Sequence, residues 1–277
     1  MSEEIKRKLK QTIFYTLIFI VVSWVLIPLI ISALYAFASS SEYYNPNRII
    51  PHSFTVSHIK TVLITLGALK GIKNSILVAL LTITISFILG VPAGYSLAKF
   101  VFPLRDSIKL SIVGLKVFPL AIMAVPLVKL YIRLRLIDTL LGVALAHAVI
   151  ALPYVIFITS SIFVGIPKEY EEAAMVFGLT RFGSFLRITL PLALPGLAAA
   201  AMFTFVMSWN EVFMAAVLTL HNRTLPAQIL SLLAGATGGA TPAYYKFAAA
   251  FIMILPAMLF VFFARKYLIT MWGISLK

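Results

Sequence analysis

The chain alternates long apolar stretches with short polar ones, and this pattern predicts six membrane-spanning helices. A helix needs about 20 apolar residues to cross about 30 Å of hydrocarbon. Stretches of that length cover residues 12–37, 74–98, 108–132, 139–164, 190–219 and 244–268. We therefore expect an all-α integral membrane protein with a transmembrane domain over residues 12–268, flanked by tails at 1–11 and 269–277.

Composition and charge support a multi-pass membrane protein. Hydrophobic residues make up 61% of the chain and charged residues 12%, too few charges to cover a water-facing surface. The net charge of +14 does not indicate a nucleic-acid partner, because Lys and Arg are scattered between apolar stretches without a basic arm. With the N-terminus inside, 14 of the 23 Lys and Arg face the cytoplasm, as is typical of cell-membrane proteins. Both tails are then cytoplasmic.

One polar interruption, residues 166–191, predicts a docking helix. It reads IPKEYEEAAMVFGLTRFGSFLRITLP. Pro167 suits the first turn of a helix, the carboxylates after it suit the positive end of the helix dipole, and Gly178 suits a left-handed cap. Helical spacing brings to one face Tyr170, Ala173, Ala174 and Phe177. We expect a helix of about three turns whose small residues let another protein approach, and a second, basic helix over residues 181–190.

The same stretch resembles the coupling loop of ATP-binding cassette (ABC) importer permeases, which has the pattern E-A-A, three residues, G, nine residues, I-x-L-P. All seven positions are met, by Glu172, Ala173, Ala174, Gly178, Ile188, Leu190 and Pro191. Such a match arises by chance on the order of once in 10^5 to 10^6 chains. One departure is that the sugar-importing branch usually has Asp before the glycine and a small residue after it, whereas this chain has Phe177 and Leu179. The resemblance implies that the seven residues couple the chain to an ATPase.

A second polar group interrupts the fifth apolar stretch, which contains the sequence SWNE at residues 208–211. Asn210 and Glu211 are costly in hydrocarbon and are expected to face the bundle interior or water. Alternatively, Glu211 lies near the outer interface with Trp209 in an aromatic belt. SWNE resembles a signature of maltose-type sugar permeases, which implies a translocation-pathway role for Asn210 and Glu211.

Two further polar residues lie inside predicted spans. Lys116 lines a water-filled path or extends to the inner headgroups, and we favour the headgroups. His147 stands alone among Leu, Ala and Val, which is typical of a packing residue rather than a ligand.

The outer loop at residues 220–242 contains the glycine-rich run GATGGATP. Such a run is normally a flexible linker. The family resemblance implies instead that this loop enters the substrate cleft of a docked binding protein, with Gly235, Gly238 and Gly239 facing it.

The chain has no G-x-x-x-x-G-K-[ST] phosphate loop, no H-E-x-x-H and no cysteine. We expect it to be neither an enzyme nor a binder of cofactor or metal, with ATP and magnesium acting on a partner ATPase. The resemblance implies the permease subunit of a binding-protein-dependent ABC importer for sugars, of the maltose or trehalose class. Its partners would be a second permease, ATPase subunits, an extracellular solute-binding protein and membrane lipid. The alternatives are import of a polyol, glycerol-phosphate or other small solute, and, from other classes, a secondary carrier or a structural membrane scaffold.

Overall fold

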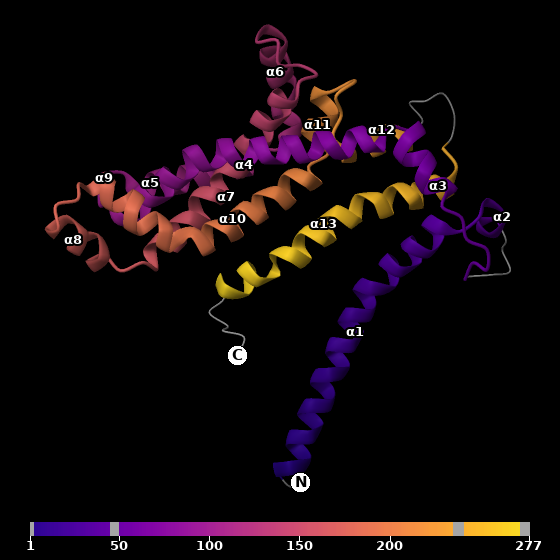
Figure 1. The fold of residues 1–277 in the computed structure, drawn as a ribbon, viewed down its shortest axis with the longest axis horizontal. Helices are drawn as coiled ribbons and strands as arrows, with labels where there is room; N and C mark the ends of the chain where they lie inside the picture. Colours follow the sequence, from indigo (N-terminus) through magenta and orange to yellow (C-terminus); the bar gives the residue numbers. More distant parts are fainter. Residues whose placement is uncertain (1–2, 45–49, 235–240, 272–277) are drawn as a thin grey trace. The chain divides into compact units, whose positions relative to one another are not determined.

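The computed structural model describes residues 3–44, 50–234 and 241–271, most of which are helical (Figure 1). Within those ranges the only β pairing is an isolated antiparallel bridge between Ala38 and Phe54. The predicted all-α class is therefore confirmed. Single helices that are long and apolar enough to cross a membrane cover Arg7–Phe37, Ala68–Lys99, Leu140–Val164, Arg181–Asn210 and Ala243–Phe260.

The chain divides into two compact units, residues 1–67 with 235–254 and residues 68–234 with 255–277. The first unit contains α1 (Glu3–Phe37), α2 (Ser40–Tyr43), α3 (Ser57–Lys60) and the π-helical η1 (Thr61–Thr65). The second contains α4 (Ala68–Lys99), α5 (Arg105–Gly114), η2 (Leu115–Val117), α6 (Leu120–Arg133), α7 (Leu140–Val164), α8 (Glu169–Val176), α9 (Arg181–Ser184), the π-helical η3 (Phe185–Thr189), α10 (Leu190–Asn210), α11 (Phe213–Leu218) and α12 (Leu225–Leu233). Helix α13 (Ala243–Met271) begins in the first unit and ends in the second.

The third predicted span, residues 108–132, is broken. Its two pieces, Arg105–Val117 and Leu120–Arg133, meet at 92°, so the chain has six spans if this bent pair counts as one. Pro119 lacks an N–H, and its ring pushes the preceding residue out of the helical region. Phe118 accordingly has φ −70° and ψ 121°. The expectation of one continuous helix here was wrong.

The fifth span also differs from its predicted bounds of 190–219. Helix α10 ends at Asn210, and Glu211 is extended with φ −74° and ψ 121° before α11 begins. At the other end, α9 and η3 run into α10, so one span covers Arg181–Asn210. The basic helix predicted over residues 181–190 is thus the first part of the fifth span and not a separate element.

Helices α4, α7 and α10 pack against one another and form the core of the second unit. Small residues allow their close approach. A Cβ at Gly90 would lie 2.7 Å from Cγ1 of Val155, and one at Gly94 would collide with Thr159 Oγ1. Figure 1 shows α8 and α9 at one end of this set of three helices and α12 toward the other.

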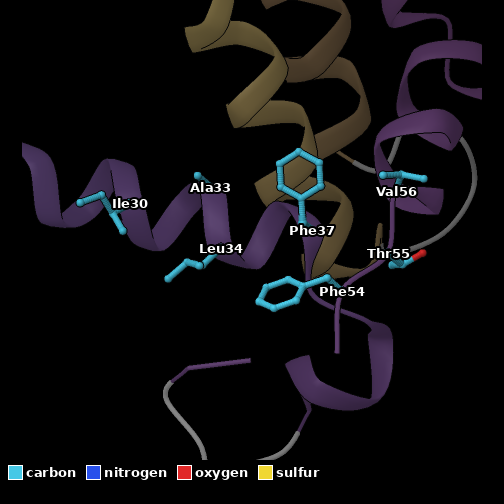
Figure 2. Close-up of a pocket in the computed structure, with 7 residues that line it drawn as sticks. All are labelled: Ile30, Ala33, Leu34, Phe37, Phe54, Thr55 and Val56. Carbon is cyan, nitrogen blue, oxygen red and sulfur yellow. The ribbon is translucent and has the colours of Figure 1, made fainter. Parts of the chain in front are cut away.

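In the first unit, the end of α1 pairs with the loop that follows it. The Thr55 N–H donates to the carbonyl of Phe37 (2.6 Å), beside the Ala38–Phe54 bridge. An apolar pocket of about 730 Å³ opens here (Figure 2), and its lining residues are Ile30, Ala33, Leu34, Phe37, Phe54, Thr55 and Val56.

Candidate functional site

The predicted docking helix is α8, which begins at Glu169, after Pro167, and is shorter than the predicted three turns. The carbonyl of Lys168 accepts the N–H groups of Glu171 and Glu172, at 2.9 and 3.0 Å. Gly178 has φ +89°, a left-handed conformation that a side chain disfavours, and thereby ends the helix as expected. The N–H of Leu179 closes the turn on the carbonyl of Ala174.

The two alanines of α8 do not form one exposed face, contrary to expectation, because α8 packs so that only one of them is covered. Ala174 is buried, whereas Ala173 and Glu172 are exposed. The exposed apolar surface, called here the α8 face, consists of Tyr170, Ala173, Val176 and Phe177. Val176 and Phe177 are 85% and 89% exposed, so the α8 face presents large apolar side chains on the surface of this chain.

The remaining coupling-loop positions lie where the chain enters the fifth span. Ile188 belongs to η3, and Leu190 and Pro191 open α10; Ile188 and Leu190 are half-buried and Pro191 is exposed. The motif therefore extends from helix α8, which has an exposed apolar face, to the start of a candidate membrane span. The spacing of the motif places its first part on α8, its glycine at the end of α8, and its last part where η3 meets α10.

Glu171, which the sequence did not single out, is the inward-facing carboxylate of α8. Its Oε2 accepts the Tyr95 hydroxyl at 2.7 Å and its Oε1 accepts the Thr189 hydroxyl at 2.8 Å. Lys99 Nζ lies 3.5 Å from Oε1 and donates to the carbonyl of Ile166 at 2.6 Å. A buried carboxylate therefore joins α8 to α4 and to the start of the fifth span.

The SWNE residues lie at the other end of α10, beside α7. Trp209 is fully buried and stacks on Phe205, which does not fit an aromatic-belt position. Glu211 turns inward, and its carboxylate accepts the backbone N–H groups of Met214 (2.9 Å) and Ala215 (3.1 Å). It thus caps the first turn of α11, where a negative charge is favourable. Asn210 is exposed on the surface of this chain.

His147 is a buried packing residue, as the sequence indicated, and both of its ring nitrogens have polar neighbours. Its Nε2 lies 2.9 Å from Glu211 Oε2, and its Nδ1 lies 2.9 Å from Ser208 Oγ. Ser208 Oγ in turn approaches Thr82 Oγ1 at 3.5 Å. Helices α4, α7 and α10 thereby share a polar network inside an apolar core, and no local sequence pattern pairs these residues.

Lys116 lies at the break of the third span. Its Nζ lies 2.9 Å from the centroid of the Tyr154 ring and 3.5 Å from the carbonyl of Ile150. A pocket of about 330 Å³ adjoins it, with Phe118 and Pro153 in its lining. The ammonium is therefore held against α7 rather than extended away from it.

A carboxylate also fastens the loop after α11. Asp138 Oδ1 accepts the backbone N–H groups of Leu220, His221 and Asn222, at 2.9, 3.0 and 2.9 Å. Burial alone would raise the pKa of the Asp138 carboxyl, but these three donors and nearby His221 outweigh it and hold the pKa below its ordinary value. The predicted loop residues Gly235, Gly238 and Gly239 lie outside the described residues, so their role stays a prediction.

Known proteins resemble this chain over most of its length. The chain is 32% identical over 227 residues to the alpha-glucoside transport system permease protein AglG of Rhizobium meliloti, covering 79% of this chain and 59% of that protein. It is 30% identical over 239 residues to the diacetylchitobiose uptake system permease protein DasC of Streptomyces coelicolor, covering 83% and 84%. A subunit of a bacterial ABC transporter that imports the acidic polysaccharide alginate shares the fold, with a TM-score of 0.77 at 21% identity, covering 96% and 98%.

The family match is broad enough to classify the chain. Residues 64–270 match the family described as "Binding-protein-dependent transport system inner membrane component". That range includes five of the six spans, all except Arg7–Phe37. It also contains α8 and the SWNE residues. The chain therefore belongs to the family of inner-membrane permease components of binding-protein-dependent ABC transport systems.

Proposed function

We propose that this permease carries oligosaccharides of the maltose or trehalose class, along a pathway that it forms with a second, non-identical permease. The observation that carries the proposal is the α8 face, an exposed apolar surface on a helix that matches the coupling motif and is rigidly capped at Gly178. Such a surface is suited to an ATPase groove. Relatives named for alpha-glucoside and diacetylchitobiose transport support a saccharide substrate.

The partners follow from the same arrangement. ATPase subunits would hold ATP and magnesium and press on the α8 face from the cytoplasm, where both termini also lie. An extracellular solute-binding protein would deliver the sugar at the opposite end. Asn210 is exposed beside the buried Glu211, so we assign Asn210 to the pathway surface and Glu211 to the support behind it.

Reconstitution tests the proposal directly. The permease, its ATPase, the second permease and the binding protein are purified together from native membranes and placed in proteoliposomes. We expect ATP-dependent uptake of labelled maltose or trehalose that requires the binding protein. Uptake of a polyol or glycerol-phosphate instead would support the alternative substrate classes, and uptake by the chain without any ATPase would identify a secondary carrier.

A cross-link tests the docking surface. Since the chain has no cysteine, an Ala173→Cys variant carries a single reactive thiol on the α8 face. We expect a bifunctional reagent to join it to the ATPase subunit. A cysteine in place of exposed Leu110 of α5 serves as the control position and should not give the same product.

A further inference from the structure

The three acidic residues of α8 have different surroundings. Glu169 and Glu172 are exposed, whereas Glu171 is 8% exposed. A buried charge is costly unless it is paired and hydrogen-bonded. Glu171 meets that requirement with partners from outside its own helix, so its position is determined by those partners.

The partners of Glu171 come from two transmembrane segments. Tyr95 and Lys99 are in the last turns of α4, and Thr189 is the last residue of η3, directly before α10. The backbone carbonyl of Glu171 also accepts the Ser184 hydroxyl at 3.4 Å. One residue of the docking helix therefore contacts both the second span and the start of the fifth.

An aromatic environment surrounds this contact. The Tyr95 ring lies 4.4 Å from that of Phe185 and 5.5 Å from that of Phe163, measured between centroids. The ring of Phe100 lies 5.7 Å from it. With little water nearby, charge-assisted hydrogen bonds are stronger and the geometry is better fixed.

The π-helical segment η3 gives a further reason to regard the Glu171 contacts as functional. Segment η3 (Phe185–Thr189) has the wider i to i+5 spacing, which is rare and often marks functional sites. Thr189 ends this turn and donates to Glu171. The carboxylate therefore holds the wide turn in one register against α8.

We propose that Glu171 is the positioning residue that fastens the docking helix to the second and fifth spans, so that displacement of α8 at the ATPase moves both spans together. This inference rests on the proposed function, in which α8 receives the motion of the ATPase. Besides the Glu171 contacts, α8 is joined to the spans by the backbone at residues 165–168 and 177–180 and by packing of its inner face. Without the carboxylate, α8 would move with the ATPase while the spans lag behind.

The test uses Glu171→Gln in the reconstituted complex, because Gln keeps the volume but removes the charge and one acceptor oxygen. We expect assembly and ATP hydrolysis to persist while the ratio of solute imported to ATP hydrolysed falls about 2- to 30-fold, the range typical of coupling positions. The matched control is Asp106→Asn, which removes an exposed carboxylate that lies 3.2 Å from Lys109. The control should leave the ratio unchanged.

A distance measurement shows whether Glu171 holds α8 in position relative to α4 or affects only the stability of the protein. Spin labels at Lys168→Cys and Leu89→Cys, both exposed positions, report the separation of α8 and α4. We expect one narrow distance distribution in each nucleotide state, and a broad one after Glu171→Gln. If Glu171→Gln prevents assembly, Tyr95→Phe and Thr189→Val each remove one donor without a charge change, and they should lower the transport ratio in the same direction.

An unchanged ratio with a narrow distribution in Glu171→Gln, or in both donor variants, would overturn the inference. The Ala173→Cys cross-link distinguishes this from failure of the proposed function. If the cross-link to the ATPase forms and Glu171→Gln has no effect, only the fastening is wrong. If it never forms, the docking role of α8 is wrong and the inference falls with it.

Discussion

Glu211 Oε2 lies 2.9 Å from His147 Nε2, joining the end of α10 to the middle of α7 inside the apolar core. The His147 side chain is fully buried and that of Glu211 is 10% exposed. The same carboxylate caps α11. The break in the fifth span is therefore fixed by a contact with another helix.

The first prediction concerns this pair. We expect His147→Leu to destabilise the protein by about 1 to 3 kcal/mol, because the mostly buried Glu211 carboxylate loses its side-chain partner and keeps only the backbone N–H groups of Met214 and Ala215. Replacing both residues, in His147→Leu with Glu211→Gln, should cost less than the sum of the single changes. Thermal unfolding in detergent measures both effects. Additive losses would show that the two side chains do not interact.

The second prediction concerns the loop held by Asp138. Because the pKa of this carboxyl is lowered in the folded protein, its stabilising contribution is present above its ordinary pKa of 3.8 and is lost as the pH falls through the lower folded value. We expect Asp138→Ala to speed hydrogen exchange at the amides of Leu220, His221 and Asn222 at neutral pH, where the wild-type amides are protected.

Asp138→Asn provides the matched control for the charge, because its amide oxygen still accepts hydrogen bonds. We expect it to retain partial protection of these amides, with no loss as the pH falls below 3.8, where the wild type loses the contribution of its carboxylate. Equal exchange rates in the wild type and in Asp138→Ala would contradict the role of Asp138 in holding this loop.

The third prediction concerns the close approach of α4 and α7. A side chain at Gly94 would collide with Thr159 Oγ1 and approach the carbonyl of Ile156 to 2.9 Å. We expect Gly94→Val to destabilise the folded protein by about 1 to 3 kcal/mol through overpacking. Gly114→Ala is the control, because nothing lies within 4 Å of a Cβ built at Gly114. Thermal unfolding of the two variants in the same detergent measures the difference.

The fourth prediction concerns the docking helix. Glu172→Lys should uncouple transport from ATP hydrolysis while the chain still folds, because the Glu172 side chain is exposed. Gly178→Ala should cost about 1 kcal/mol or more, because its φ of +89° disfavours a Cβ, and should weaken association with the ATPase. Gly165→Ala, at φ −70°, is the control. Normal uptake and ATPase association in both variants would refute the docking role.

The sequence predicted those features that depend on residues close together in the chain. The number of spans follows from apolar length, and the end of α8 follows from a glycine at a left-handed position. The break at Pro119 was also visible in principle, since a proline restricts the residue before it. Its consequence for the third span was missed because Pro is often tolerated in membrane helices, as Pro92 and Pro153 are here.

Pairings between distant segments could not be predicted in this way. Helical spacing places Ala173 and Ala174 near one another but does not say which side of α8 the spans cover. Likewise, nothing near His147 indicates Glu211, and nothing near Glu171 indicates Tyr95 or Thr189. These contacts depend on how α4, α7 and α10 pack, which is set by the whole fold.

The break in the third span restricts what can surround it in the membrane. Where one helix stops and another starts, the last carbonyls and first N–H groups have no partners in the helix, and hydrocarbon cannot supply any. Lys116, beside the break, has contacts within the chain for its ammonium, the Tyr154 ring and the carbonyl of Ile150, but these do not supply the helix ends. Lipid tails alone therefore cannot satisfy the polar groups on this side of the chain. We therefore expect another protein chain or water to cover this side of the chain.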